Sequence, residues 1–252
     1  MAMIEVEQLS FSYGRRAVLD SLTLSLDEGG VVALLGPNGS GKTTLLKLIL
    51  GLLRPAQGTI RLKGRHIRDI SSVELARRLA YVPQMHREAF GYRVADVVLM
   101  GRMPHTSFFG GYGKEDRRVV REALERLSIG HLAERPYTEV SGGERQLTLI
   151  ARALAQGATT FIMDEPTNGL DYGNQGRLLE RIGCLAREGY TFLFTTHHPD
   201  HALAVADRVV MMLGGVIIRD GPPRETVTPT TLEELYGIDG RFFAGKSCHN
   251  GK

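Results

Sequence analysis

Gly36-Pro37-Asn38-Gly39-Ser40-Gly41-Lys42-Thr43-Thr44 directly follows an apolar run at residues 31–35 and satisfies the pattern G-x-x-x-x-G-K-[ST]. The apolar run predicts a buried strand, and the apolar residues after Thr44 predict a helix. In this strand-to-helix context, glycines let successive backbone N–H groups face a polyphosphate, and the helix dipole favours the anion. We expect Lys42 to reach the terminal phosphates and the Thr43 hydroxyl to bind Mg²⁺. A turn that only resembles the motif rarely has the full eight-residue pattern, so the sequence predicts a nucleotide site.

The composition is that of a globular chain. Its 252 residues, 42% hydrophobic and 23% charged, can form one large α/β domain or a domain with an inserted subdomain. The net charge of +3 is too small to indicate a nucleic-acid partner, and none is expected. Basic residues do cluster between Arg61 and Arg78. We interpret them as solvated faces of strands and a helix, with a docking surface for an acidic partner or lipid headgroups as the alternative.

The cysteines and the hydropathy pattern limit the class of protein. Cys184 and Cys248 are far apart and lack metal-ligand spacing, so the sequence indicates neither a disulfide framework nor a zinc site. The N-terminus lacks the basic region and apolar core of an export signal, and no apolar stretch reaches about 18 residues. We therefore expect a chain in a reducing compartment that is neither exported nor membrane-spanning, and whose role at a membrane would depend on a partner.

The predicted elements indicate an α/β fold. Strand-like alternation at residues 4–6 and 22–26 precedes the glycine-rich loop, and a mostly helical block runs from about Ser71 to Ala155. Strands at residues 160–163 and 191–196 then restore the β–α–β rhythm of a parallel sheet, with the helical block inside this scheme.

Two shorter signals come near the end of the chain. Gly214-Gly215 lies between two apolar runs, which is the pattern of a two-residue hairpin. Residues 231–236 predict one short helix.

Two carboxylates follow the apolar residues 161–163. At the end of a buried strand, Asp164 can hold Mg²⁺ through water, and Glu165 can polarise the water that attacks the γ-phosphate. Two adjacent acids could also belong to a solvated loop, but a neighbouring phosphate loop makes this alternative weaker. The sequence therefore assigns Asp164 and Glu165 to the nucleotide site.

Three histidines follow the next apolar strand. We interpret His197, at the end of that strand, as a sensor of the γ-phosphate that orients the attacking water. His197 and His201 are four residues apart, but Pro199 and the change from strand to helix argue against one metal-binding helical face. His198 and His201 are interpreted as capping or loop histidines.

Ser141-Gly142-Gly143-Glu144 precedes a long helical pattern. Taken alone, this segment is best interpreted as an ordinary helix cap, although a hydroxyl and free N–H groups at a helix start can also bind phosphate. One nucleotide cannot readily use two helix starts of one compact subunit. We therefore expect a head-to-tail dimer in which this segment completes the nucleotide site of a second copy of the chain.

The motifs, in this order, resemble those of the ATP-binding-cassette (ABC) ATPases. Tyr13 resembles the aromatic residue that stacks on adenine, residues 36–44 the Walker A loop, Gln84 the Q-loop glutamine, Ser141 to Glu144 the signature motif, Asp164 and Glu165 the Walker B pair, Asn168-Gly169-Leu170-Asp171 the D-loop and His197 the switch histidine. The departures are mild. Val140 and Glu144 replace a common leucine and glutamine, and Asn168-Gly169 replaces Ser-Ala.

The resemblance implies a set of site residues. ATP would be bound by Tyr13, Gly36, Pro37, Asn38, Gly39, Ser40, Gly41, Lys42, Thr43 and Thr44, and from the second copy by Ser141, Gly142, Gly143, Glu144 and Asp171. Mg²⁺ would be held by Thr43, Gln84 and Asp164, and hydrolysis would use Glu165, His197, Lys42 and Gln84.

The resemblance also implies a domain plan. Residues 1–252 would form one nucleotide-binding domain of class α/β, a P-loop NTPase core with a mostly parallel sheet, an N-terminal antiparallel β subdomain and an inserted helical subdomain at approximately 85–157. Met85 to Val98 would line the surface where a membrane subunit docks.

Residues 94–105 and 170–175 resemble ATPases of importers for iron–siderophore complexes, haem, cobalamin and, in some members, molybdate or tungstate. This likeness implies a peripheral subunit at the cytoplasmic face of the cell membrane, bound to polytopic permease subunits and, through them, to a substrate-binding protein. The alternatives are a soluble ABC ATPase that remodels a partner, as in iron–sulfur assembly, and a P-loop kinase, which would leave the Ser141 segment unexplained. The residues do not identify the cargo.

Overall fold

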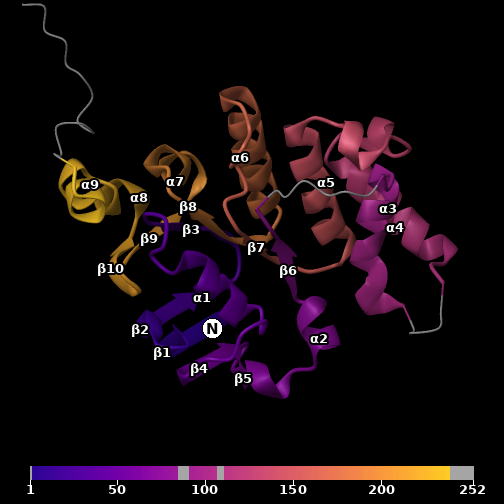
Figure 1. Cartoon of the computed structure of the whole chain (residues 1–252). Coiled ribbons are helices and arrows are strands. Elements are labelled where there is room, and N and C mark those ends of the chain that lie inside the picture. Colours follow the sequence, from indigo (N-terminus) through magenta and orange to yellow (C-terminus); the bar gives the residue numbers. More distant parts are fainter. Residues whose placement is uncertain (1, 85–90, 107–110, 239–252) are drawn as a thin grey trace, which may run out of the picture.

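The computed structural model describes residues 2–84, 91–106 and 111–238, so that Cys248 and residues 85–90 of the expected docking segment lie outside the described residues. Two sheets organise the chain (Figure 1). The N-terminal sheet is antiparallel, with strand order β2 (Arg16–Leu26), β1 (Ile4–Tyr13), β4 (Gln57–Leu62) and β5 (Arg65–His66).

The second sheet is mostly parallel. Its order is β10 (Val216–Gly221), β9 (Arg208–Leu213), β3 (Gly30–Leu35), β8 (Thr191–Thr196), β7 (Thr160–Met163) and β6 (Leu79–Val82). The strands from β9 to β6 are parallel to their neighbours, and only β10 pairs with β9 in the antiparallel sense. The predicted α/β class, with an N-terminal antiparallel part and a mostly parallel sheet, is confirmed.

Helix α1 (Lys42–Ile49) lies between the two sheets (Figure 1). Side chains alternate along β3, so that Val32 and Leu34 face the core shared with α1, whereas Ala33 and Leu35 face the core on the other side. A strand that is covered on both faces has a continuous apolar sequence, which explains the run at residues 31–35.

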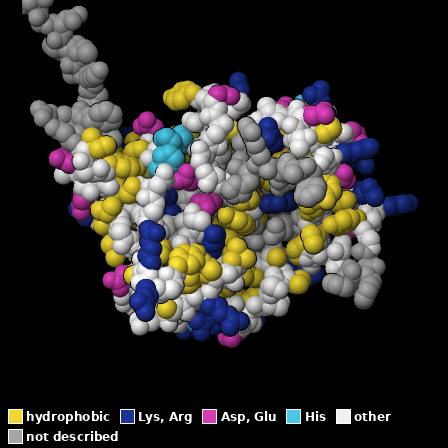
Figure 2. Space-filling model, viewed as in Figure 1, with side chains coloured by type: hydrophobic (Ala, Val, Ile, Leu, Met, Phe, Trp, Pro, Cys, Tyr) yellow, Lys and Arg dark blue, Asp and Glu magenta, His cyan; other side chains and the backbone are white. Residues whose placement is uncertain are grey.

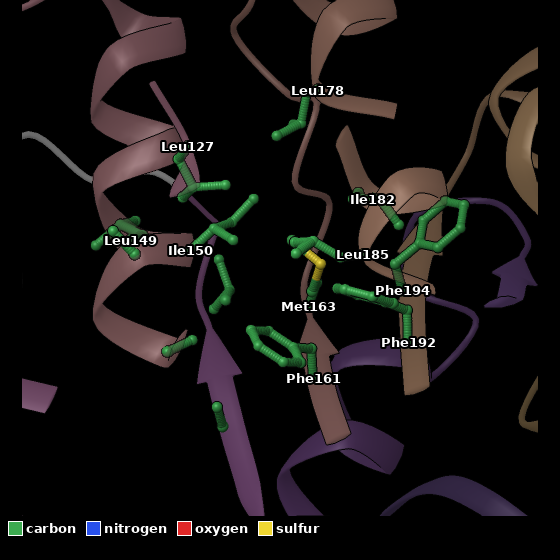
Figure 3. Packing of buried hydrophobic residues seen from close by; sticks show 14 of the residues in the cluster. Leu127, Leu149, Ile150, Phe161, Met163, Leu178, Ile182, Leu185, Phe192 and Phe194 are labelled. Atoms are coloured by element: carbon green, nitrogen blue, oxygen red, sulfur yellow. The ribbon is translucent and has the colours of Figure 1, made fainter. Parts of the chain in front are cut away.

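The other face of the parallel sheet is covered by α5 (Gly142–Ala155), α6 (Tyr172–Arg187) and α7 (Pro199–Val205). Figure 3 shows Phe161 and Phe192 of neighbouring strands in one hydrophobic cluster with Ile150 of α5 and Ile182 of α6. The rings of Phe161 and Phe192 are stacked, with centroids 4.9 Å apart. This packing fixes β7 and β8, whose C-terminal ends carry the predicted catalytic residues.

The helices α3 (Val94–Leu99) and α4 (Lys114–Arg126) pack against α5. Arg102 joins this group, since its Nε lies 2.9 Å from Asp116 Oδ1 and its Nη1 donates to the Ala155 carbonyl over 2.8 Å. The expected limits of an inserted helical subdomain, about residues 85 and 157, stay a prediction. The shorter helices are η1 (Ile67–Asp69), α2 (Ser72–Ala76), η2 (Met100–His105), η3 (Gly130–Leu132), η4 (Tyr137–Glu139), α8 (Pro223–Thr226) and α9 (Pro229–Tyr236).

One strand was missed by the mostly helical interpretation of residues 71–155. Strand β6 has only four residues, and it follows α2 at the edge of the parallel sheet. So short an apolar run has no distinctive period, and its pairing with β7 determines its conformation.

Two other expectations agree with the structure. The hairpin at Gly214-Gly215 is present, and both glycines have positive φ, +57° and +89°. In the basic cluster, Arg65 and Arg78 both pair with Glu74, at 2.7 and 3.0 Å, which favours solvated faces. Among the described residues, no helix combines the length and apolar composition needed to cross a membrane.

Candidate nucleotide site

A cavity of about 730 Å³ opens at the C-terminal edge of the parallel sheet. Ligands of α/β sheets commonly bind at this edge, because the loops after several strands meet there. The predicted site residues that line it are Tyr13, Asn38, Gly39, Gly41, Lys42, Thr43, Thr44, Gln84, Asp164, Glu165 and His197. The fold thus brings together residues from distant segments of the chain, while Gly36, Pro37 and Ser40 support the loop from outside the lining.

The glycine-rich loop is fixed against the ends of β8 and β9. The Gly36 N–H donates to the Thr196 carbonyl over 3.2 Å, and a Cβ at Gly36 would collide with the Met212 carbonyl oxygen. Gly39 and Gly41 have φ of +83° and +101°, a region that residues with a Cβ rarely adopt. The loop conformation therefore requires glycine at these positions for reasons of packing and backbone geometry.

Helix α1 presents an uncapped N-terminus to the cavity. Its N-cap residue, Gly41, has no side chain to accept a hydrogen bond, and its first turn contains no acidic residue. The free N–H groups and the helix dipole favour an anion at this position. The polarity of this helix end therefore matches a phosphate group.

Lys42 lies at the start of this helix and is only 5% exposed. Its Nζ donates to the carbonyls of Gly36 and Pro37 over 2.6 and 3.0 Å. Burial lowers the pKa of Lys42, although the nearby carboxylates of Glu165 and Asp164 act in the opposite direction. A bound polyphosphate would strengthen the charged form of this lysine.

Asp164 is 5% exposed and accepts hydrogen bonds from two hydroxyl groups. Its Oδ1 accepts from Thr43 Oγ1 over 3.1 Å and from Thr195 Oγ1 over 2.7 Å. Gln84 lines the same cavity. A hydroxyl, a carboxylate and an amide oxygen are the hard ligands that Mg²⁺ prefers, so these residues fit a Mg²⁺ that remains bound mainly to phosphates and water.

Glu165 is held in an unusual backbone conformation. It has φ of +44°, and its N–H donates to Thr195 Oγ1 over 2.8 Å. Its Oε1 lies 3.1 Å from His197 Nδ1, without hydrogen-bond geometry, and 4.0 Å from Lys42 Nζ. The carboxylate is thus placed between an ammonium and an imidazole at the cavity wall.

A histidine patch lies on the surface at α7 (Figure 2), and the rings of His197, His198 and His201 lie close together. The ring centroids of His197 and His198 are 4.0 Å apart, and those of His198 and His201 are 4.7 Å apart. The rings are therefore neighbours in a row. In the described part of the chain, no three His, Cys, Asp or Glu side chains converge as a metal site.

The interpretation of His201 as a loop or capping histidine is wrong. His201 lies within α7 and is 8% exposed, with its ring nitrogens 3.1 Å from Thr167 Oγ1 and 3.2 Å from Gln175 Oε1. Burial lowers the pKa of His201, and the charge of the neighbouring His198 lowers it further, by a smaller amount. His198 does occupy the N-cap position of α7, but its side chain makes no capping hydrogen bond.

The Ser141 segment lies outside the cavity lining. Ser141 Oγ accepts from the Glu144 N–H over 3.3 Å, and Glu144 Oε2 accepts from the Ser141 N–H over 2.7 Å, which forms a reciprocal capping box. Gly142 opens α5, and a Cβ at Gly143 would lie 3.0 Å from the Asn174 side chain. Asp171, also outside the lining, caps α6 by accepting from the Asn174 N–H over 2.9 Å.

The lining also contains Arg16, Ala17, Val18 and Gly214, which the sequence did not indicate as site residues, and Asn168, which it placed in the D-loop only. Arg16 is opposite Tyr13 in the β1–β2 register, beyond the turn at Gly14 and Arg15. A glycine directly after Tyr13 could have indicated this hairpin. Arg16 brings a second strongly basic side chain to the cavity, on the side of Tyr13.

Comparisons with known proteins agree with this geometry. The profile of the ABC transporter family matches residues 19–168, more than half of the chain. The iron(3+)-hydroxamate import ATP-binding protein FhuC of Bacillus subtilis is 37% identical over 96% of this chain and 90% of its own length. The hemin import ATP-binding protein HmuV of Pseudomonas putida is 39% identical over 94% of this chain and 93% of its own length.

Among solved structures, an inward-facing ABC transporter described as of metal-chelate type matches with a TM-score of 0.85 and 36% identity, over 95% of this chain and 90% of that one. The fold, the lining of the cavity and these relatives agree, and the chain belongs to the ABC transporter family as an ATP-hydrolysing, ATP-binding protein.

Proposed function

We propose that this chain is the ATP-hydrolysing subunit of a membrane importer whose cargo is a metal chelate. Three similar proteins support the cargo class, since their names refer to iron(3+)-hydroxamate, to hemin and to a metal-chelate type of transporter. The observation that carries the catalytic part is the position of Glu165 between Lys42 and His197 in the wall of one cavity.

In this proposal each residue has a defined role. Glu165 accepts the proton of the attacking water, and His197 fixes the orientation of that water and of the Glu165 carboxylate. Lys42 stabilises the negative charge that develops on the γ-phosphate, and the ring of Tyr13 supports the adenine. Thr43, Asp164 and Gln84 would hold Mg²⁺. When bound, this ion would neutralise part of the phosphate charge.

We further propose that two copies act head to tail. The Ser141 turn is outside the cavity of its own subunit, and it leads into a capped helix start at which Ser141 is exposed and Gly142 to Glu144 are partly exposed. In a dimer, this turn and Asp171 of one copy would close the nucleotide site of the other. ATP would then favour the closed dimer, and loss of the γ-phosphate would release it.

The proposed location is the cytoplasmic face of the cell membrane, through permease subunits and indirectly a substrate-binding protein. Isolation of the tagged chain from its native membranes tests this partnership. Co-purification of a polytopic membrane subunit is the expected result. Recovery with soluble factors alone would contradict the importer function and favour a remodelling ATPase.

The cargo class needs a second measurement. In vesicles that contain the isolated complex, we expect ATP-dependent uptake of a ferric chelate or of haem, abolished by Glu165→Gln. Uptake of molybdate without uptake of any chelate would contradict the proposed cargo while leaving the importer function intact.

A further inference from the structure

The C-terminal helix α9 reaches the candidate catalytic histidine. Its last residue, Tyr236, donates a hydrogen bond from its hydroxyl to the backbone carbonyl of His197 over 2.7 Å. The two residues are about forty positions apart in the sequence, so only the tertiary fold brings them together. We propose that Tyr236 is a positioning residue for ATP hydrolysis, which acts by fixing the backbone of His197 at the edge of the nucleotide site.

The inference rests on the proposed role of His197 and depends on short distances. His197 Nδ1 is 3.1 Å from Glu165 Oε1, and His197 directly follows β8. Past the end of that strand, the peptide between His197 and His198 is held by side chains: its N–H donates to Thr196 Oγ1 over 3.0 Å, and its carbonyl accepts from Tyr236. A carbonyl held by Tyr236 restricts the peptide that carries His197, and a misplacement of about 1 Å in an active site can reduce a rate by about 10²-fold.

Helix α9 is anchored well enough to serve as this support. Leu232 and Leu235 are 5% and 2% exposed and belong to the core that also contains Phe194 of β8. At the start of the helix, Thr231 Oγ1 donates to the carbonyl of Thr226 over 2.6 Å, and Thr228 caps the first turn. The helix that carries Tyr236 is therefore itself fixed to the core, which restricts the position of the Tyr236 hydroxyl.

The environment of Tyr236 keeps its hydroxyl group protonated, so that it can act as a hydrogen-bond donor. Burial, with a smaller contribution from the charge of Glu165, raises the pKa of Tyr236 to about 12. The hydroxyl consequently keeps its proton at any pH at which the protein would hydrolyse ATP. It can donate to the carbonyl of His197 throughout this range.

A double-mutant cycle between Tyr236→Phe and His197→Ala tests the inference, with hydrolysis and ATP binding measured on the full-length chain. We expect Tyr236→Phe to lower kcat about 10-fold while the KM for ATP changes less than about 2-fold. In the His197→Ala background, Tyr236→Phe should have no further effect, because its action passes through His197. The ring NMR shifts of His197 should change in Tyr236→Phe.

The matched control is Tyr190→Phe, which removes a hydroxyl that accepts from Arg126 Nη1 over 3.1 Å. This variant should keep the wild-type kcat and His197 shifts. If His197→Ala slows hydrolysis but Tyr236→Phe resembles Tyr190→Phe, or lowers kcat equally in both backgrounds, the inference is wrong. If His197→Ala does not slow hydrolysis, the proposed role of His197 is wrong and the inference falls with it.

Discussion

Glu165 shows how much one residue of the site depends on its surroundings. A non-glycine residue at φ +44° is a strained conformation, of the order of 1–3 kcal/mol, and such strain is often found at functional sites. The hydrogen bond from the Glu165 N–H to Thr195 and the rigid ends of β7 and β8 hold it in place. This arrangement directs the carboxylate toward Lys42 and His197.

We predict that Glu165→Gln slows ATP hydrolysis by about 10²- to 10⁴-fold, because the amide cannot accept the proton of the attacking water. ATP binding should be preserved, since the phosphate loop is unchanged. Hydrolysis assays and nucleotide titration measure the two properties. Glu180→Gln, on an exposed turn of α6, is the control and should retain the wild-type rate. Unimpaired turnover in Glu165→Gln would require another base.

At the scale of the element, the start of α5 is stabilised by its own side chains. The capping box between Ser141 and Glu144 satisfies two N–H groups that a helix start otherwise leaves free. This box explains why glutamate is acceptable where the family commonly has glutamine, since both side chains can accept from the Ser141 N–H.

Glu144→Ala should therefore destabilise the fold by about 1 kcal/mol, whereas Glu144→Gln should cost less. Hydrogen bonds from the Ser141 backbone and side chain lower the pKa of Glu144 from 4.5. A carboxyl group whose pKa is lowered by folding stabilises the folded state at pH values above its ordinary pKa. This contribution is lost as the pH falls through the lowered pKa. In urea unfolding, the excess unfolding free energy of the wild type over Glu144→Gln should therefore decrease as the pH falls below 4.5. A pH-independent difference would rule out this role of the carboxylate.

The β9–β10 hairpin gives a second test at this scale. A Cβ at Gly215 would collide with the Val18 carbonyl of β2, while a Cβ at Gly214 would meet open space, although both glycines have positive φ. Gly214→Ala should cost about 1–2 kcal/mol for the left-handed backbone alone. Gly215→Ala should cost about 1–3 kcal/mol more, because β2 must also move. Equal unfolding free energies of the two variants would contradict the close packing of the hairpin.

At the scale of the whole molecule, the important feature is that the Ser141 turn does not line the cavity that contains the glycine-rich loop. The cavity contains Lys42 and the proposed catalytic residues, but Ser141 and Asp171 are not part of its lining. A subunit with an intact cavity would therefore depend on a second copy for its remaining contacts.

This dependence predicts complementation. Neither Lys42→Ala nor Ser141→Arg should be active as a homodimer, because the first damages the phosphate loop and the second the turn that closes the neighbouring site. A mixture of the two should recover activity, since a heterodimer contains one site with both intact parts. Steady-state hydrolysis of the mixture, against each variant alone, measures this recovery. Full activity of either homodimer would exclude a shared site.

The sequence by itself determined the local features of this protein. The glycine-rich loop, the buried strands of residues 160–163 and 191–196 and the Gly214-Gly215 hairpin all follow from short-range rules: apolar runs, glycine positions and the residues that end a strand. The order of the motifs also indicated the family that the comparisons show.

Only the tertiary structure decided the features that depend on distant segments. Strand β6 is a strand because β7 lies beside it, and His201 is buried between Thr167 and Gln175. The contact of Tyr236 with His197 belongs to the same class. Their energies come from contacts between segments far apart in the chain, and no local pattern of residues records which segments will meet.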